Sequence, residues 1–104
     1  MMIWVDDIRP CPDGYVWVKS VNAAILCIKN YEIEYAIGRG SKIELIDIDH
    51  DAGEYANEGG DYIKLLDWLE ETGRNYPIRV HSMNPVGRGN MQRIIKRNGW
   101  MEVM

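Results

Sequence analysis

The two histidines of this chain, His50 and His81, each follow a short apolar run that is typical of a buried β-strand. In an open α/β sheet, ligands bind beyond the carboxyl ends of the strands, so both imidazoles are expected at one mouth. Two imidazoles that flank a phosphodiester form an acid–base pair: one takes a proton from water and the other protonates the departing oxygen. His50 and His81, together with Asp49, are therefore the predicted catalytic residues of a phosphoesterase. Which histidine is the acid stays open, and a structural histidine bonded to a backbone carbonyl is the alternative for either one.

Carboxylates follow two of the expected strands. Asp6 and Asp7 come after one apolar run, while Asp49 and Asp51 stand on either side of His50. Hard oxygen ligands of this kind suit Mg²⁺ or Mn²⁺. Crowded carboxylates raise one another's pKa, so a metal, an arginine or a shared proton must relieve them. Asp6, Asp7 and Asp51 are thus candidate ligands of a divalent metal, and no other cofactor is predicted. The alternative is that Asp7 bonds the backbone of the following loop and Asp51 caps a turn.

A phosphate-binding segment is predicted directly after His81. It brings a hydroxyl, an amide, two glycines and an arginine to the start of an expected helix. Glycines let backbone N–H groups turn toward an anion, and a helix N-terminus adds positive partial charge. We expect Ser82, Asn84 and Arg88 to hold a phosphate, with Arg9 contributing from the first loop. An ordinary strand-to-helix turn built with proline and glycine is the alternative.

The elements that must position these residues follow from hydrophobic periodicity. Strands are predicted at residues 2–6, 15–19, 43–49 and 77–82, and helices from Ser20, from near Asp61 and over residues 89–98. Alternating strands and helices favour parallel pairing with right-handed crossovers. The predicted fold is a single α/β domain over residues 1–104, with a small doubly wound, mainly parallel sheet of about four strands and flanking helices. Asp47 receives no role, because its strand is expected to be covered on both faces.

Composition and charge restrict the class of protein. The two cysteines fit neither a disulfide framework nor metal-ligand spacing, and no segment is typical of a signal peptide or a membrane span. We therefore expect a cytoplasmic protein that binds no membrane. Residues 1–73 hold six Lys and Arg against fifteen Asp and Glu, whereas residues 74–104 hold six against one. A basic final third can receive phosphates, so Arg93, Lys96 and Arg97 are either contacts to RNA or a solvated helix face. The oligomeric state is not predicted.

Three blocks of sequence carry a resemblance to a known family over nearly the whole chain: Val5–Gly14, Asp49–Asp51 and Arg79–Gly87. Together they resemble the cyclic-phosphate-processing receiver domains, a group of small bacterial and phage proteins. The resemblance implies a truncated, flavodoxin-like form of the response-regulator receiver fold and an activity on cyclic phosphate ends in RNA repair.

The resemblance also implies roles for single residues. It matches Asp6 and Asp7 to the acidic pair after the first receiver strand, places Asp49 near the phospho-accepting aspartate, and matches Ser82 to a hydroxyl residue after the next strand. The last receiver strand, with its lysine, has no counterpart, which counts against phosphorelay signalling. The first receiver helix is replaced by a proline-rich loop.

Three functions remain open from the sequence. The first is a phosphoesterase that processes a cyclic phosphate, either the 2',3' end of RNA or a free cyclic nucleotide. The second is a non-catalytic receiver-like module that binds a protein or a nucleotide. The third is a metal-dependent nuclease or phosphatase that uses the aspartates. Convergence of the histidines and carboxylates favours catalysis, whereas imidazoles on opposite sides of the sheet favour the binding module.

Overall fold

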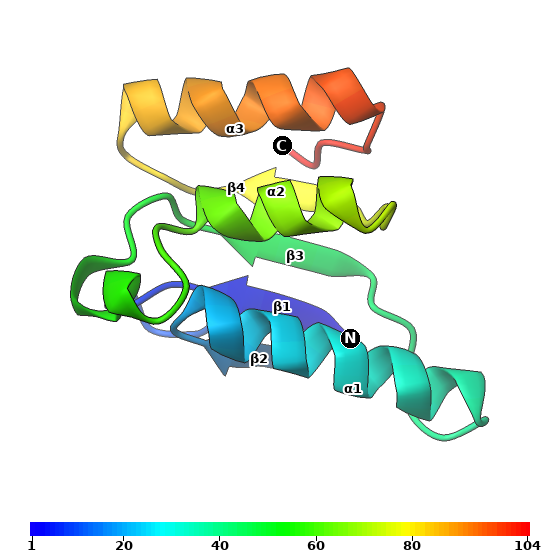
Figure 1. The fold of residues 1–104 in the computed structure, drawn as a ribbon. Coiled ribbons are helices and arrows are strands. Elements are labelled where there is room, and N and C mark those ends of the chain that lie inside the picture. Colours follow the sequence, from blue (N-terminus) through cyan, green and yellow to red (C-terminus); the bar gives the residue numbers. More distant parts are fainter.

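The fold is a four-stranded parallel sheet with three α-helices, seen in a computed structural model that describes all 104 residues (Figure 1). The sheet order is β2-β1-β3-β4, and all three neighbouring pairs are parallel. The elements in chain order are β1 Met2–Val5, β2 Tyr15–Val18, α1 Val21–Ala36, β3 Leu45–Ile48, a short 3₁₀ helix Gly53–Asn57, α2 Ile63–Glu71, β4 Ile78–Val80 and α3 Pro85–Asn98. The predicted α/β receiver-like fold is confirmed.

The hydrophobic core lies between one face of the sheet and the helices. Alternate strand residues, such as Ile3, Ile46 and Ile78, point to this face and are fully buried. The core cluster joins them to buried residues from all three helices, among them Ile28, Leu66 and Met91. The helices therefore form one layer on one side of the sheet.

The other face of the sheet carries no helix. We call it the helix-free face. Its outward residues are largely polar or aromatic: Trp4, Tyr15, Trp17, Asp47 and Arg79. The loop after β1 folds over part of this face, since Trp4 Nε1 donates a hydrogen bond to the carbonyl of Arg9 (3.1 Å). The expectation that the strand of Asp47 is covered by helices on both faces was wrong. The reason is that β1 and β2 are joined by a loop and not by a helix.

Local sequence signals explain where the helices begin. Ser20 caps α1, because its hydroxyl accepts a hydrogen bond from the Ala23 amide (3.0 Å). Asn84 caps α3 in the same way, and Pro85 occupies the first helical position, where its missing N–H costs nothing. The last helix consequently starts four residues earlier than predicted.

Beyond α3, the chain returns to the edge of the sheet. Glu102, which belongs to no strand, forms a single parallel bridge with Ile78 of β4. This bridge lies where a fifth strand would be, but no strand develops from it. None of the helices has the length and apolar character needed to cross a membrane.

Candidate functional site

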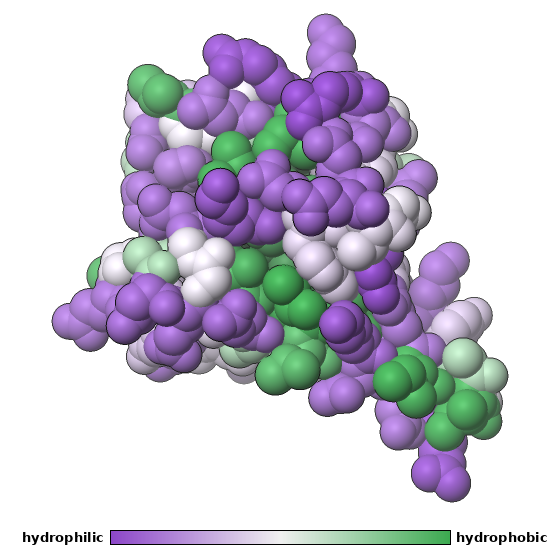
Figure 2. Space-filling view, viewed as in Figure 1, coloured by the Kyte–Doolittle hydropathy of each residue, from purple (hydrophilic) through white to green (hydrophobic).

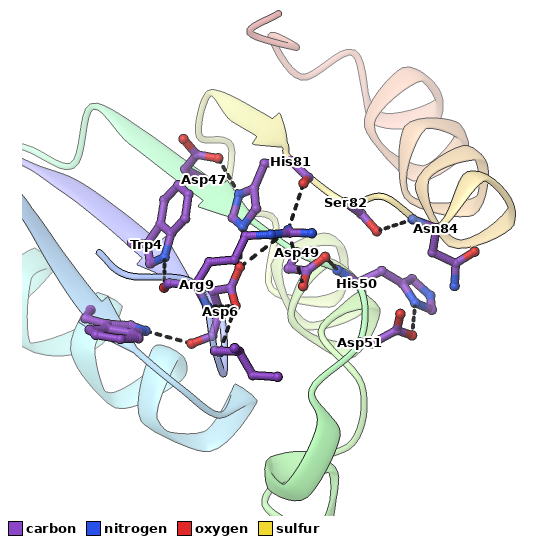
Figure 3. Close-up of polar contacts among 12 residues, drawn as sticks. Trp4, Asp6, Arg9, Asp47, Asp49, His50, Asp51, His81, Ser82 and Asn84 are labelled. Atoms are coloured by element: carbon purple, nitrogen blue, oxygen red, sulfur yellow. Dashed lines mark hydrogen bonds and ion pairs between the residues drawn. The ribbon is translucent and has the colours of Figure 1, made fainter. Parts of the chain in front are cut away.

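The polar residues of the site come from the loops that follow β1, β3 and β4, and we call this carboxyl-end region the mouth (Figure 3). Parallel strands bring these loops to one edge of the sheet. The register aligns Val5 with Ile48, and Ile48 with Val80. Asp6, Asp49 and His81 each follow these aligned positions directly, and the close-up shows all three around the guanidinium of Arg9.

Asp6 is the most constrained of these residues, with its side chain 1% exposed. Its Oδ1 accepts hydrogen bonds from the amides of Ile8 and Arg9, both at 2.9 Å, and its Oδ2 lies 2.8 Å from His81 Nε2. Burial alone would raise the pKa of Asp6. The two amide hydrogen bonds and His81 outweigh burial and hold its pKa below the usual value. Asp6 is therefore an anion that fixes the loop after β1.

His81 lies between two carboxylates. Its Nδ1 is 2.7 Å from Asp47 Oδ1 and its Nε2 is 2.8 Å from Asp6 Oδ2, while its ring stacks on Trp4 with centroids 4.0 Å apart. Burial would lower the pKa of His81, but the hydrogen bonds and charges of Asp47 and Asp6 raise it overall. Both nitrogens thus lie within hydrogen-bond distance of a carboxylate, so the protonated ring donates to both and no nitrogen is left free to accept a proton from water.

An acidic cluster lies beside this histidine. One carboxylate oxygen from each of Asp6, Asp7 and Asp49 falls within 4.8 Å of the others. Burial raises the pKa of Asp7, and the charges of Asp6 and Asp49 raise it further. Gly53 makes room for the cluster, because a Cβ there would lie 2.3 Å from Asp7 Oδ2. The three carboxylates suit a hard divalent cation, although both oxygens of Asp6 already have partners.

Arg9 supplies part of the positive charge that such a cluster needs. Its Nη1 donates to the carbonyl of His81 (3.1 Å) and lies 3.7 Å from an oxygen of both Asp6 and Asp49. The side chain remains 40% exposed, so one side of the guanidinium faces solvent. This arrangement leaves Arg9 able to meet an anionic ligand at the mouth.

His50 lies on the other side of Asp49 and points toward α3 (Figure 3). Its Nδ1 is 2.8 Å from Asp51 Oδ1, and no hydrogen bond involves its Nε2. The ring packs directly on Gly87, where a Cβ would approach within 2.4 Å of it. Asp51 thus bonds His50, and it is Asp49 that joins Asp6 and Asp7 in the acidic cluster.

The two imidazoles do not face one another. His50 comes two residues after the core-facing Ile48, whereas His81 comes one residue after the core-facing Val80, and Ile48 pairs with Val80. Because strand residues alternate between faces, the two histidines leave the sheet on opposite sides. The structure therefore brings His81 to the carboxylates and places His50 against α3.

The residues predicted to hold phosphate are divided by the structure. Ser82 is buried and its hydroxyl accepts from the amide of Asn84 (3.1 Å), while the side chain of Asn84 accepts from the amide of Gly87 (3.0 Å). Both side chains therefore build the turn into α3. Arg88, in the first turn of α3, makes no ion pair and no side-chain hydrogen bond, which leaves its guanidinium available to a ligand.

The basic side chains of α3 have separate surroundings. Arg97 forms a two-contact ion pair with Glu70 of α2, at 2.9 and 2.8 Å. Arg93 and Lys96 line a surface groove with Trp100 on the side of α3 that faces the C-terminal segment. The predicted basic patch is thus reduced to Arg93 and Lys96.

Sequence reasoning missed two members of the site, Asp47 and Trp4. Both lie on the helix-free face, and both contact the ring of His81. A signal was present, because a buried charge in the middle of an apolar strand requires a partner. The partner could be identified only from the register that pairs Asp47 with Arg79 and brings His81 two residues further along the same face.

Comparison with known families gives one finding on identity. The model of the family described as the cyclic-phosphate processing receiver domain matches residues 1–97 of the chain. No curated protein and no solved structure matches this chain.

Proposed function

Because the chain belongs to the cyclic-phosphate processing receiver domain family, we propose that it is a phosphoesterase that opens a cyclic phosphate, the 2',3' end of an RNA strand. In this reaction water attacks phosphorus and one ring P–O bond breaks. The proton lost by water ends on the released ribose oxygen, and the product is a phosphomonoester. The observation that carries the proposal is the His50–Asp51 pair at the mouth, beside Asp49 and Arg9.

In this proposal His50 is the group that takes the proton from water. The carboxylate of Asp51 accepts from Nδ1, which fixes the tautomer in which Nε2 carries a free lone pair. Histidine in this state is a general base near neutral pH. Gly87 leaves the space in which the ring lies flat against the first turn of α3.

His81 has a different role, as a positioning residue. Its two hydrogen bonds to Asp6 and Asp47 hold a fixed positive charge behind the mouth. The two rings leave the sheet on opposite faces, so they do not support a mechanism in which one histidine lies on each side of a phosphate. That divergence also favours the non-catalytic module over the two-histidine enzyme. The free Nε2 of His50 and the converging carboxylates favour catalysis with one histidine.

A divalent cation fits the acidic cluster, and this favours the metal-dependent phosphoesterase as the second candidate. Asp6, Asp7 and Asp49 would hold Mg²⁺ or Mn²⁺, with Asp7 and Asp49 contributing most because both oxygens of Asp6 have partners. When bound, such a cation polarises a phosphoryl oxygen. Burial raises the pKa of Asp7, the charges of Asp6 and Asp49 raise it further, and a cation held beside the three carboxylates would oppose both effects.

The deciding experiment is an assay of the purified protein on 2',3'-cyclic nucleotides and on oligonucleotides with a cyclic phosphate end. Loss of a general base costs about 10²-fold to 10⁴-fold in rate, so we expect His50→Ala to lose at least about 10²-fold in kcat/KM. We expect Arg9→Gln to raise KM, whereas Arg39→Gln, at an exposed arginine without an ion pair, serves as the matched control. Undiminished turnover in His50→Ala would exclude the assigned base.

Two further arms separate the alternatives. Activity that survives exhaustive EDTA treatment excludes the metal-dependent reaction, whereas loss restored by Mg²⁺ or Mn²⁺ and absent in Asp7→Asn supports it. A protein that turns over neither substrate with any metal, but binds a nucleotide at the mouth, is the non-catalytic module. Replacing Arg93 and Lys96 with Gln should weaken an oligonucleotide more than a mononucleotide, because only the oligonucleotide has upstream phosphates.

A further inference from the structure

Helix α1 carries a second apolar stripe that the fold does not use. Its buried residues are Val21, Ala24 and Ile28. Leu26 lies two residues from both Ala24 and Ile28, which places it about 200° around the helix from each of them. Its side chain is 62% exposed. The helix therefore presents apolar groups to solvent on the side opposite the core.

The exposed stripe has the spacing of a coiled-coil seam. It consists of Ala23, Leu26, Asn30, Ile33 and Ile37, which follow one another at intervals of three, four, three and four residues. Ile37 belongs to the same row because it is the C-cap and its amide still bonds to Ile33 (3.1 Å). All five are exposed, with Ile33 and Ile37 both at 58%. Alternating intervals of three and four are what two helices need to pack side by side.

The one polar residue of this seam carries information about the partner. Asn30 stands at the centre, at an a position when Ala23 is also a and Leu26 is d. A single asparagine at an a position lowers the stability of a helix pair but specifies its register, because each amide is satisfied by the asparagine of the other helix. That arrangement requires the same residue on the partner, which points to a second copy of this chain.

The charges beside the seam fit the same occupant. Lys29 takes a g position and Glu34 the following e position, and these two positions face each other across parallel helices. Both residues are exposed and form no ion pair within the chain; Lys29 Nζ lies 6.0 Å from the Trp68 ring. A parallel pair would form two identical Lys29–Glu34 contacts across its twofold axis.

We propose that α1 pairs with α1 of a second copy in a parallel, twofold-symmetric dimer along this seam. The helix lies at the surface, and its C-terminal half extends past the end of the sheet (Figure 1), so a partner helix has access to it. Hydrophobic residues gather over α1 and at its far end in the space-filling view (Figure 2). Because the axis runs along α1, which begins at the mouth and leads away from it, both mouths open at the same end of the dimer.

The size of the seam sets the expected strength. A helix of 16 residues is about 24 Å long, and two such helices give an interface at the small end of the range, below about 1,200 Å². Each helix is already held by its own core, so little ordering entropy is lost on pairing. We therefore expect a dissociation constant in the micromolar range, about 10 to 100 µM.

Sedimentation equilibrium of the full chain tests the dimer. Across about 1 µM to 1 mM protein, the apparent mass should rise from the 12.0 kDa monomer toward twice that value. Ile33→Glu should remain a monomer throughout, whereas Met101→Glu, at an exposed apolar residue away from the seam, should behave as the parent chain. Circular dichroism verifies that each variant is folded. A parent chain that stays monomeric at 1 mM, or equal effects of both variants, would overturn the proposal.

Charge exchange and crosslinking test the parallel orientation. Lys29→Glu and Glu34→Lys should each weaken the dimer about threefold, and the double exchange should restore it. In a chain with Cys11 and Cys27 replaced by Ser, Ala23→Cys should form a disulfide with itself on mild oxidation. Failure of the double exchange to restore pairing would overturn the proposal. So would crosslinking of Ala23→Cys only to Ile33→Cys, because that pairing is antiparallel.

Discussion

Substitution of Asp47 by Asn should destabilise the protein and do so most strongly below neutral pH. The carboxylate of Asp47 is 2% exposed and receives the Nδ1 proton of His81 at 2.7 Å. Asn keeps an oxygen in place but removes the negative charge. His81 then retains Asp6 as its one charged partner.

The expected magnitude comes from the difference between two kinds of hydrogen bond. Bonds to charged groups contribute about 1.5 to 3 kcal/mol, whereas neutral ones contribute about 0.5 to 1.5 kcal/mol. Asp47→Asn should therefore lower the free energy of unfolding by about 1 to 2 kcal/mol. Asp47→Ala removes the acceptor of the His81 Nδ1 proton altogether and breaks a buried pair, so it should lower the free energy of unfolding by about 3 to 5 kcal/mol. The loss expected for Asp47→Ala approaches the lower end of the total free energy of unfolding of natural proteins, about 5 to 15 kcal/mol.

The pH dependence follows from the raised pKa of His81. A group whose pKa is higher in the folded state stabilises that state fully below its unfolded pKa, and the contribution is lost as pH rises through the folded pKa. For His81 the reference value is 6.5. The stability difference between the parent chain and Asp47→Asn should therefore be largest near pH 6 and should shrink toward about pH 9.

Urea unfolding followed by circular dichroism at both pH values measures these differences, with EDTA present so that no cation competes at Asp6. Asp67→Asn is the matched control, because Asp67 is 39% exposed and its oxygen lies 3.9 Å from Lys64 Nζ. An NMR titration of His81 should show its pKa falling in Asp47→Asn. Equal stability of parent and variant at pH 6, or the same loss at both pH values, would refute the ionic account of this network.

Three further substitutions test the geometry of the mouth. Gly87→Ala should displace the His50 ring, because the new Cβ would lie 2.4 Å from it, and should reduce kcat with little effect on urea unfolding. Gly53→Ala should lower the free energy of unfolding by at least about 1 kcal/mol, because φ there is +56° and the new Cβ would collide with Asp7. The same substitution should weaken the binding of Mn²⁺, measured by titration calorimetry. Asn84→Ala should lower the free energy of unfolding by about 1 kcal/mol, because α3 loses its cap, while KM for a cyclic nucleotide stays unchanged. A raised KM would instead support the prediction that Asn84 contacts the phosphate.

Much of the fold follows from local signals in the sequence. All four strands were predicted, as were the Ser20 cap and the buried positions Ala24 and Ile28 of α1. The start of α3 was placed at Gly89 because Pro85 and Gly87 before it are typical of a turn, whereas packing of Gly87 against His50 requires a residue without a side chain. Tertiary contact outweighed propensity at this helix.

The site was less predictable, because its geometry depends on register. The sequence places His50 and His81 after two strands, but only the pairing of Ile48 with Val80 shows that they leave on opposite faces. The need for positive charge among the aspartates was predicted in general terms, and the structure meets it with Arg9 and His81. A loop of irregular backbone carries Arg9 there, and no periodicity describes such a loop.

In a sheet that has helices on just one side, alternate residues of the same strand have two different roles. In β1, Ile3 and Val5 support the core, while Trp4 between them stacks on the histidine of the site. In β3, Asp47 stands in the same relation to Ile46 and Ile48. A scan of every substitution in these strands should show tolerance with a period of two residues. Folding yield would follow one set of positions, and ligand chemistry would follow the set between them, so selection can reshape the site without rebuilding the core.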